Sequence, residues 1–266
     1  MNARTHERTG LRRYLPRSRR GWVVAVLGTL SVLAVVAFLL MRVTPWWHQP
    51  LDATQDEVVN VADDAQRRVI ELHNTMQRSM GGENTWIIRD EHVNALLAVK
   101  FAEAAGTQAH AVGVSAPSVY FGDGQITVSA RTTKVPGGPA DGAVVSVAFS
   151  ISTETDMNGM AWGRFKLDGL WIGALRVPKA VAEKRIEELL PQVMPAIHQA
   201  ITLQLGARNA RDVGPEVERA ISATLKGEAF PLRFRVNRRT VAIREITVAD
   251  RTLAITFAPI QEAGRP

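Results

Sequence analysis

The amino-acid sequence predicts an α+β protein: an N-terminal transmembrane helix followed by an antiparallel sheet packed with helices. The first observation is an uncharged apolar run over residues 22–41. The second is a series of segments between residues 112 and 257 in which apolar and polar residues alternate. Strands with one apolar face are typical of antiparallel sheets, because parallel strands are apolar on both faces. Stretches with helical periodicity lie outside these segments, as in other α+β proteins.

Composition divides the chain into successive segments. They are a basic cytoplasmic tail at residues 1–20, a signal anchor at 21–43, a linker at 44–53, an amphipathic helix at 54–82, an extracytoplasmic α+β domain at 83–260 and a disordered tail at 261–266. The basic tail holds seven arginines and one glutamate, so it accounts for the whole net charge of +6. Because the rest of the chain carries no net charge, the sequence argues against nucleic-acid binding.

The apolar run has the length of a membrane span. At about 1.5 Å per residue, about 20 helical residues cross the roughly 30 Å hydrocarbon core of a bilayer. Arg19, Arg20 and Trp22 flank the run on one side, and Trp46 and Trp47 flank it on the other, as basic and aromatic residues do at membrane interfaces. The arginines predict a cytoplasmic N-terminus and a domain on the far side of the membrane.

Two alternatives to a membrane anchor are weaker. A cleaved signal peptide has a shorter apolar region followed by small residues, which residues 42–47 do not supply. A buried core helix seldom contains an uncharged run of this length. The chain has no cysteine, so no disulfide stabilises the outer domain, and its core must do so alone.

The amphipathic helix carries one apolar stripe. The stripe consists of Val58, Ala62, Ala65, Val69, Leu72 and Met76. This spacing also occurs in a coiled-coil stalk, which would dimerise the protein beside the membrane. The stripe covers about three heptads and includes two alanines, which form a weak seam. We therefore expect the stripe to pack against the protein's own sheet.

The next elements alternate between strand and helix. Residues 86–88 form a short strand, and Asp90 begins a helix that ends near Gly106. Two strands over residues 112–121 and 125–133 flank Gly122-Asp123-Gly124, a strong hairpin signal. In the strand around Val145 the polar positions are small, so another segment could lie close to that face, although such faces are usually solvated. In the strand over 161–171, the alternation places Phe165, Leu167 and Trp171 on one face.

The last third of the chain contains helices and then strands. Pro178 suits the first turn of a helix, and Pro191 and Pro195 break that helix into two segments ending near residue 205. A further helix covers residues 214–227. Three strands follow over residues 232–236, 240–248 and 252–257, with a bulge near Arg244-Glu245 and a tight turn at Asp250-Arg251.

The sequence contains no catalytic, cofactor-binding or metal-binding motif. The six histidines are scattered, and none lies at zinc-ligand spacing from a second ligand. No nucleophile elbow or phosphate-binding loop is present. We therefore expect a protein that is not an enzyme and has no cofactor. A hydrolase whose carboxylate pair is brought together by folding is the third alternative, because sequence does not reveal such a pair.

Three segments resemble the YpmS-like family of single-pass bacterial envelope proteins, some of which are thought to be related to tubular lipid-binding domains. The segments are residues 86–97, 121–128 and 167–178. Asn94, Gly124, Gly173 and Pro178 match the family pattern at what we interpret as turn or cap positions. The resemblance implies a bacterial inner-membrane anchor, a periplasmic or other extracytoplasmic domain, and a strongly curved sheet that wraps a helix beside an apolar groove. It brings no catalytic residue.

Together, these features predict a membrane-anchored domain that binds a lipid or another apolar ligand without catalysis. Residues that line an apolar pocket cannot be told from core residues by sequence, so no ligand-binding residue is assigned. The alternative is an envelope scaffold or protein-interaction module. It would bind a partner protein, or a second copy of the chain, through a sheet edge or the stripe over residues 58–76.

Overall fold

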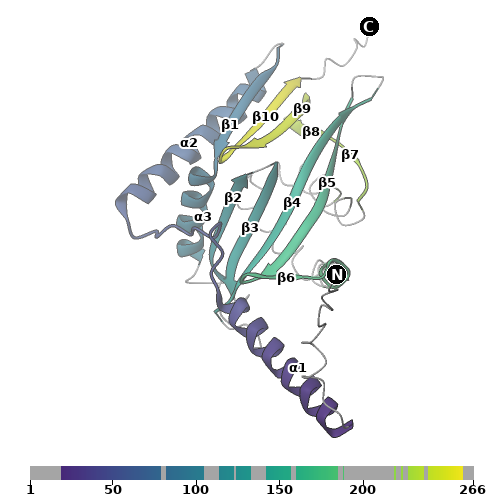
Figure 1. Cartoon of the computed structure of the whole chain (residues 1–266). Coiled ribbons are helices and arrows are strands. Elements are labelled where there is room, and N and C mark those ends of the chain that lie inside the picture. Colours follow the sequence, from purple (N-terminus) through teal and green to yellow (C-terminus); the bar gives the residue numbers. More distant parts are fainter. Residues whose placement is uncertain are drawn as a thin grey trace, which may run out of the picture.

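The structure, a computed structural model, describes most of the folded part of the chain. The described residues are 19–78, 82–104, 114–122, 124–132, 142–156, 160–184, 227–236 and 239–259, with positions 188, 219 and 223. Their antiparallel strands form two sheets, and helices lie at one side of them (Figure 1). The α+β class and the antiparallel pairing are therefore confirmed.

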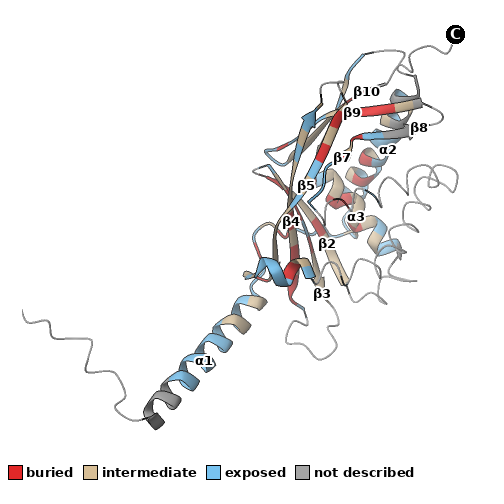
Figure 2. Ribbon diagram, turned by 90° about the vertical axis from the view of Figure 1, so that its right-hand side faces the viewer, coloured by how far each residue is buried: buried red, intermediate tan, exposed pale blue. Residues whose placement is uncertain are grey.

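The helices differ in what they contact. Their bounds are α1 (Arg19–Arg42), α2 (Asp56–Arg78) and α3 (Asp90–Ala104). Helix α1 extends away from the sheets, whereas α2 and α3 pack against each other (Figures 1 and 2). Before α2, the Asp52 carboxylate accepts hydrogen bonds from the main-chain N–H and the hydroxyl of Thr54, and these bonds lower the pKa of Asp52.

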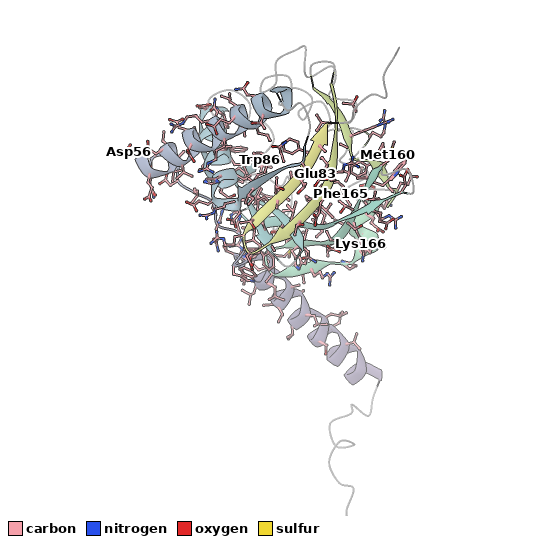
Figure 3. All side chains as sticks on the ribbon, turned by 90° about the horizontal axis from the view of Figure 1, so that it is seen from above. Asp56, Glu83, Trp86, Met160, Phe165 and Lys166 are labelled. Carbon is pink, nitrogen blue, oxygen red and sulfur yellow. The ribbon has the colours of Figure 1, made fainter. Side chains whose placement is uncertain are left out.

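The stripe of α2 packs within the chain, as expected, but against a helix over its first turns. Val58 and Ala62 form a buried cluster with Ala95 and Ala98 of α3. Alanine side chains on both helices allow the two backbones to approach closely. Further along α2, Leu72 reaches the four-stranded sheet, where it packs with Trp86 against a cluster of buried side chains (Figure 3).

Four strands form the sheet next to α2. In spatial order they are β1 (Asn84–Arg89), β10 (Thr252–Pro259), β9 (Arg239–Ala249) and β8 (Arg233–Val236). The expected bulge is confirmed, because Thr256 pairs with Glu245 while Phe257 pairs with Ile243, so Arg244 is the extra residue.

The expected turn between β9 and β10 is also confirmed. Asp250 and Arg251 have φ angles of 46° and 63°, which fit a two-residue hairpin turn.

The second sheet is a meander. Its strands are β2 (Val114–Gly122), β3 (Gln125–Thr132), β4 (Val144–Thr155), β5 (Ala161–Ile172) and β6 (Leu175–Val177), with β7 (Phe230–Pro231) paired to β5. Gly124 lies in the β2–β3 turn with a φ of 73°, as the hairpin signal requires.

A bulge in β5 contradicts the expected arrangement of that strand. Ala148 pairs with Gly169 and the next residue, Phe149, pairs with Leu167, so Asp168 is an extra residue. An extra residue moves the side chains that follow to the other face. Trp171 therefore lies on the face opposite Phe165 and Leu167, and the prediction that the three share one face is wrong.

The core lies between the two sheets. Phe121 and Ile126 of the six-stranded sheet pack with Val248 of the four-stranded sheet, and Phe149 packs against them. In a second buried cluster, the rings of Phe165 and Phe230 stack at 5.3 Å. Each sheet thus turns one apolar face toward the other, as the alternating pattern predicts.

The prediction of one strongly curved sheet is wrong. The strands form two sheets that are not strongly curled (Figure 1). The reason is the position of β1, which precedes β2 in the chain but pairs with β10. Strands β8 to β10 therefore complete a second sheet around β1 instead of extending the first.

The N-terminal helix was expected to cross a membrane. In the described part of the chain, no helix meets the length and apolarity of a membrane crossing. The described side chains of α1 begin at Val26. The transmembrane helix therefore stays a prediction. Residues 1–18, the loop at 136–139, the end of the chain from residue 260 and most of the helices expected after Pro178 lie outside the described residues.

Candidate functional site

The segment after α1 is not a free linker. It lies across a row of residues that pair in register through five strands of the six-stranded sheet. The row consists of Ser118, Ser129, Ser146, Trp171 and Arg176, each paired with the next. The three serines are buried, with exposed fractions of 0%, 2% and 0%. Their small side chains leave a shallow trough on the outer face of the sheet.

Trp47 and His48 fill this trough. The Trp47 Nε1–H donates a hydrogen bond to Ser146 Oγ at 3.1 Å. His48 Nδ1 lies 2.9 Å from Ser129 Oγ and 3.0 Å from Ser118 Oγ, and the two hydroxyls are 2.8 Å apart. We call this cluster the serine joint. It fastens the segment after α1 to β2, β3 and β4.

The serine joint is electrically neutral. Burial, and then the charge of Arg131, lower the pKa of His48 below its usual value, so the ring is uncharged at neutral pH. An uncharged ring can share its Nδ1 with two hydroxyls whichever tautomer it adopts. A buried cluster of this kind avoids the desolvation cost that a buried ion would carry.

A serine beside a histidine is also the arrangement of a nucleophile and its base. In the serine joint, however, His48 Nε2 is buried and has no described hydrogen-bond partner, so no carboxylate orients the ring. Ser118 and Ser129 are inaccessible to a substrate. The arrangement therefore positions the chain, and we assign it no chemistry.

Aromatic rings continue the joint toward the surface. Trp46 lies edge-on to Tyr120 at 4.9 Å and to Trp47 at 5.7 Å, and Trp47 lies edge-on to Trp171 at 5.7 Å. Arg176 covers the Trp171 ring at 5.6 Å. Trp46 and Trp47, which the sequence placed at a membrane interface, thus form part of a layer of rings on the outer face.

Glycine allows these rings to lie flat on the sheet. A Cβ on Gly122 would meet the Tyr120 ring, and a Cβ on Gly169 would meet the Trp171 ring. The bulge at Asp168 is what turns Trp171 to this face. The aromatic layer therefore depends on local features of two strands.

The turn between β5 and β6 holds the end of α1. The Ala174 N–H donates to the Leu40 carbonyl at 2.9 Å. Gly173 has a φ of 60°, and a Cβ there would clash with the carbonyl oxygens of Leu40 and Met41. Gly173 was predicted to be a turn residue, and the structure adds that it contacts the last turn of α1. The end of α1 is thus fixed to the sheet at this turn, and the segment that follows α1 is fixed at the serine joint.

A second polar cluster joins α3 to both sheets. Asp90 is buried, and both of its carboxylate oxygens accept from Arg251 Nε, at 3.2 and 2.9 Å. The Arg251 side chain is 55% exposed and also donates to Gln49 Oε1. Asn94 bonds the β2 backbone twice, donating to the Val119 carbonyl and accepting from the Val119 N–H. We call Asp90, Asn94 and Arg251 the arginine joint.

The positions that match the family pattern fall in different places. Gly124 and Gly173 lie in turns, as expected, and Pro178 directly precedes the helical residues 179–184. Asn94 lies inside α3 and not at a cap. From this position its side-chain amide donates a hydrogen bond to the backbone of β2. Arg19, Arg20 and Trp22 belong to α1, and their side chains lie outside the described residues.

Sequence reasoning missed the serine joint. His48, Ser118, Ser129 and Ser146 were not singled out, although the small polar positions of β4 were noted as able to accept a close neighbour. The only signal in the sequence was thus the pattern of small polar residues in β4. The pairing that aligns the three serines is set by register, which the sequence does not show.

The described residues include two open clefts. One, of about 190 Å³, lies between β5, β6 and residues 178–182 and is lined by Asp168, Arg176 and Lys179 among others. The other, of about 310 Å³, lies between the segment after α1, α2 and α3, and includes Asn94 and Arg251. Within the described part of the chain, no three side chains of His, Cys, Asp or Glu gather as they would around a metal ion.

Comparisons with protein-family models, with curated proteins and with solved structures found no match.

Proposed function

We propose that the protein is a single-pass membrane protein whose folded part stands at the bilayer surface and binds a lipid or another apolar ligand without catalysis. The proposal is supported above all by the exposed side chains of α1 (Figure 2). They are Val26, Leu27, Leu30, Val32, Leu33, Val35, Val36, Leu39 and Leu40, and between 37% and 62% of each is exposed. Moving such a helix from water into hydrocarbon would stabilise it by roughly 10 kcal/mol.

The junction supports a fixed orientation of the folded part. A flexible linker would let a domain turn freely on its anchor. Here the end of α1 bonds the β5–β6 turn, and the serine joint holds the next residues. We propose that the N-terminus is in the cytoplasm of a bacterial cell, and that the folded part is on the outer side of the inner membrane.

The membrane proposal is tested by labelling single cysteines in the full chain. The chain contains no cysteine, so the introduced cysteine is the only thiol that the reagent can label. Thr5→Cys places a thiol in the basic tail, and Gln66→Cys places one on the exposed side of α2. With a maleimide that does not cross membranes, intact spheroplasts should label Gln66→Cys, and Thr5→Cys should react only after lysis. Labelling of both in intact spheroplasts, or release of the protein by alkaline carbonate, would contradict the proposal.

The ligand proposal is supported by the resemblance to envelope proteins and by the position of the larger cleft. This cleft is bounded by Gln49 and Leu51, seven and nine residues after the end of α1. Its volume of about 310 Å³ is at the lower end of small-molecule sites, which hold about 300–1,000 Å³.

Native mass spectrometry of the full chain in detergent, followed by organic extraction, tests ligand binding. We expect a stoichiometric lipid that survives purification. Val61→Trp, which fills the cleft, should release it, whereas Val59→Trp, on an exposed position of the same helix, should retain it. A ligand-free mass in the presence of added phospholipid would rule out the ligand proposal.

A second candidate function is protein interaction through a sheet edge. Strand β1 ends the strand order of the four-stranded sheet, and its Ile87 is 57% exposed. Such an edge can accept a strand from a partner. The stripe of α2 is less suitable, because Val58, Ala62 and Ala65 are already buried. Loss of a co-purifying protein, or of a dimer, in Ile87→Lys would favour this candidate over the first.

A further inference from the structure

The end of the six-stranded sheet that holds α1 carries three arginines and an exposed tryptophan. Arg42 ends α1, Arg176 ends the row of paired residues, and Arg131 lies two residues after Ser129 in β3. Trp46 is 64% exposed. We infer that this set, the arginine collar, binds the headgroups of anionic phospholipids. The inference rests on the proposed insertion of α1 and adds a preference for one class of lipid.

The contacts of α1 place the collar at the depth of the headgroups. If α1 spans the bilayer, the Leu40 and Met41 carbonyls lie at the edge of the hydrocarbon core. The Ala174 N–H bonds the first of these, and Arg176 follows two residues later. Arg131 pairs with Val144, whose carbonyl accepts from the Gly173 N–H at 2.7 Å. Arg42 and Arg176 are therefore one or two residues from the contact with the end of α1, and Arg131 lies two strands across from it, through Val144.

The dimensions of a bilayer agree with this placement. The headgroup region adds about 5–8 Å on each side of the hydrocarbon core. A strand residue rises by about 3.3 Å and neighbouring strands lie about 4.8 Å apart, so these arginines lie within roughly 10 Å of the contact with α1. The guanidinium groups of the collar can thus reach the layer of phosphate groups without any change in the fold.

Among the described contacts, none of the three arginines forms an ion pair with a carboxylate. Arg42 lies over the Phe38 ring at 4.8 Å. Arg131 donates to the Gly142 carbonyl at 3.1 Å, and Arg176 donates to the main-chain carbonyl of Asp168 at 2.7 Å. These partners are carbonyls and a ring, not carboxylates. Each guanidinium has five N–H donors, so most remain for a phosphate, which arginine can bind through two parallel bonds.

The tryptophan is presented in a suitable way. Tyr120 and Trp47 contact the Trp46 ring edge-on, and the ring still remains largely exposed. Exposed aromatic rings with a polar N–H are stable at the boundary between hydrocarbon and headgroups. The collar therefore combines apolar insertion with positive charge in one small area of the outer face.

The experiment compares lipid retention by the full chain in nanodiscs that contain equal amounts of phosphatidylglycerol and phosphatidylcholine. After release into the mass spectrometer, the wild-type protein should retain more phosphatidylglycerol. Each arginine at an anionic surface favours binding about fivefold, so the double variant Arg131→Gln/Arg176→Gln should lower the enrichment by up to about 25-fold. The basic tail is identical in all variants, so it does not contribute to the difference.

Arg164→Gln is the matched control. Arg164 is exposed on β5, the strand of Trp171, but it pairs with Ser152 at the far end of the sheet. It should leave the enrichment unchanged. Arg42→Gln, which lies outside the sheet, supplies a second test if the double variant does not fold. An unchanged lipid ratio in both collar variants, or an equal loss in Arg164→Gln, would overturn the inference. Failure of α1 to enter the nanodisc would instead refute the proposed function on which it rests.

Discussion

The two polar joints of this protein fasten helical segments to the sheets by opposite means. The arginine joint uses charge, and the Arg251 side chain reaches solvent while Asp90 is buried. The serine joint uses neutral groups, of which His48 and the three serines are buried. A buried ion is stable where its partner stays partly hydrated, whereas a fully buried polar cluster must be neutral and paired. The comparison shows that the depth of a joint determines the chemistry it can use.

The largest expected effect comes from breaking the serine joint. Ser129→Leu places a larger side chain in a filled space and leaves His48 and Ser118 without a shared partner. We expect the free energy of unfolding of the full chain in detergent to fall by about 4 kcal/mol. Chemical denaturation measures it, and Ser152→Leu, on an exposed position of β4, should change it by less than about 0.5 kcal/mol. Equal effects would show that the joint is not tightly packed.

Removing the amide of the arginine joint should have the next largest effect. Asn94→Ala leaves the N–H and the carbonyl of Val119 without their partner in a partly buried setting. The expected loss is about 2–3 kcal/mol by the same measurement. Asn60→Ala, on an exposed position of α2, is the control and should be close to neutral. A loss below about 1 kcal/mol would indicate that water replaces the amide.

Salt concentration should change the contribution of the arginine joint to stability but not that of the serine joint. Arg251→Met leaves the buried Asp90 carboxylate without its cation, at a cost of about 1–2 kcal/mol at low ionic strength. Because the Arg251 side chain is half exposed, that difference from wild type should shrink in 1 M salt. The effect of Ser129→Leu should not change with salt. A salt-independent effect of Arg251→Met would contradict a charge-based joint.

The smallest expected effect is a pH dependence of the serine joint. The folded pKa of His48 lies below its unfolded value of 6.5, so the unfolded chain binds the proton more readily. Stability from this residue is therefore complete above pH 6.5 and is lost as pH falls toward the folded pKa. His48→Gln should flatten the stability curve in this window. The lowered pKa of Asp52 acts in a separate window, below pH 3.8. An unchanged slope in the variant would show that His48 is not its source.

Much of the fold could be predicted because its signals are local. The hairpin at Gly124, the turn at Asp250 and the bulge at Arg244 each follow from a few neighbouring residues. The bulge at Asp168 has no such signal, since the pattern around it continues in phase as if the residue were paired. That one residue decided the face of Trp171. The division into two sheets was likewise hidden, because it depends on β1 pairing with a strand over 160 residues away.

The candidate site was harder to predict than the fold. Trp46 and Trp47 were expected at a membrane interface, and nothing in the sequence indicated that they contact a sheet. The three serines lie side by side because of the cross-strand register, which pairs residue 118 with 129 and residue 129 with 146. Contacts of this kind depend on several elements at once, so a single stretch of sequence does not contain them.

The contact between the β5–β6 turn and the end of α1 can form only after most of the chain has been synthesised. Leu40 leaves the ribosome long before Ala174, whose N–H donates to the Leu40 carbonyl. At about 5–20 residues per second, the intervening chain takes on the order of ten seconds to make. During that interval Tyr120, Ser129 and Ser146, which contact Trp46, His48 and Trp47, are made first, and Trp171 is made last. The helix and the sheet therefore join late in synthesis, once the chain has passed β5.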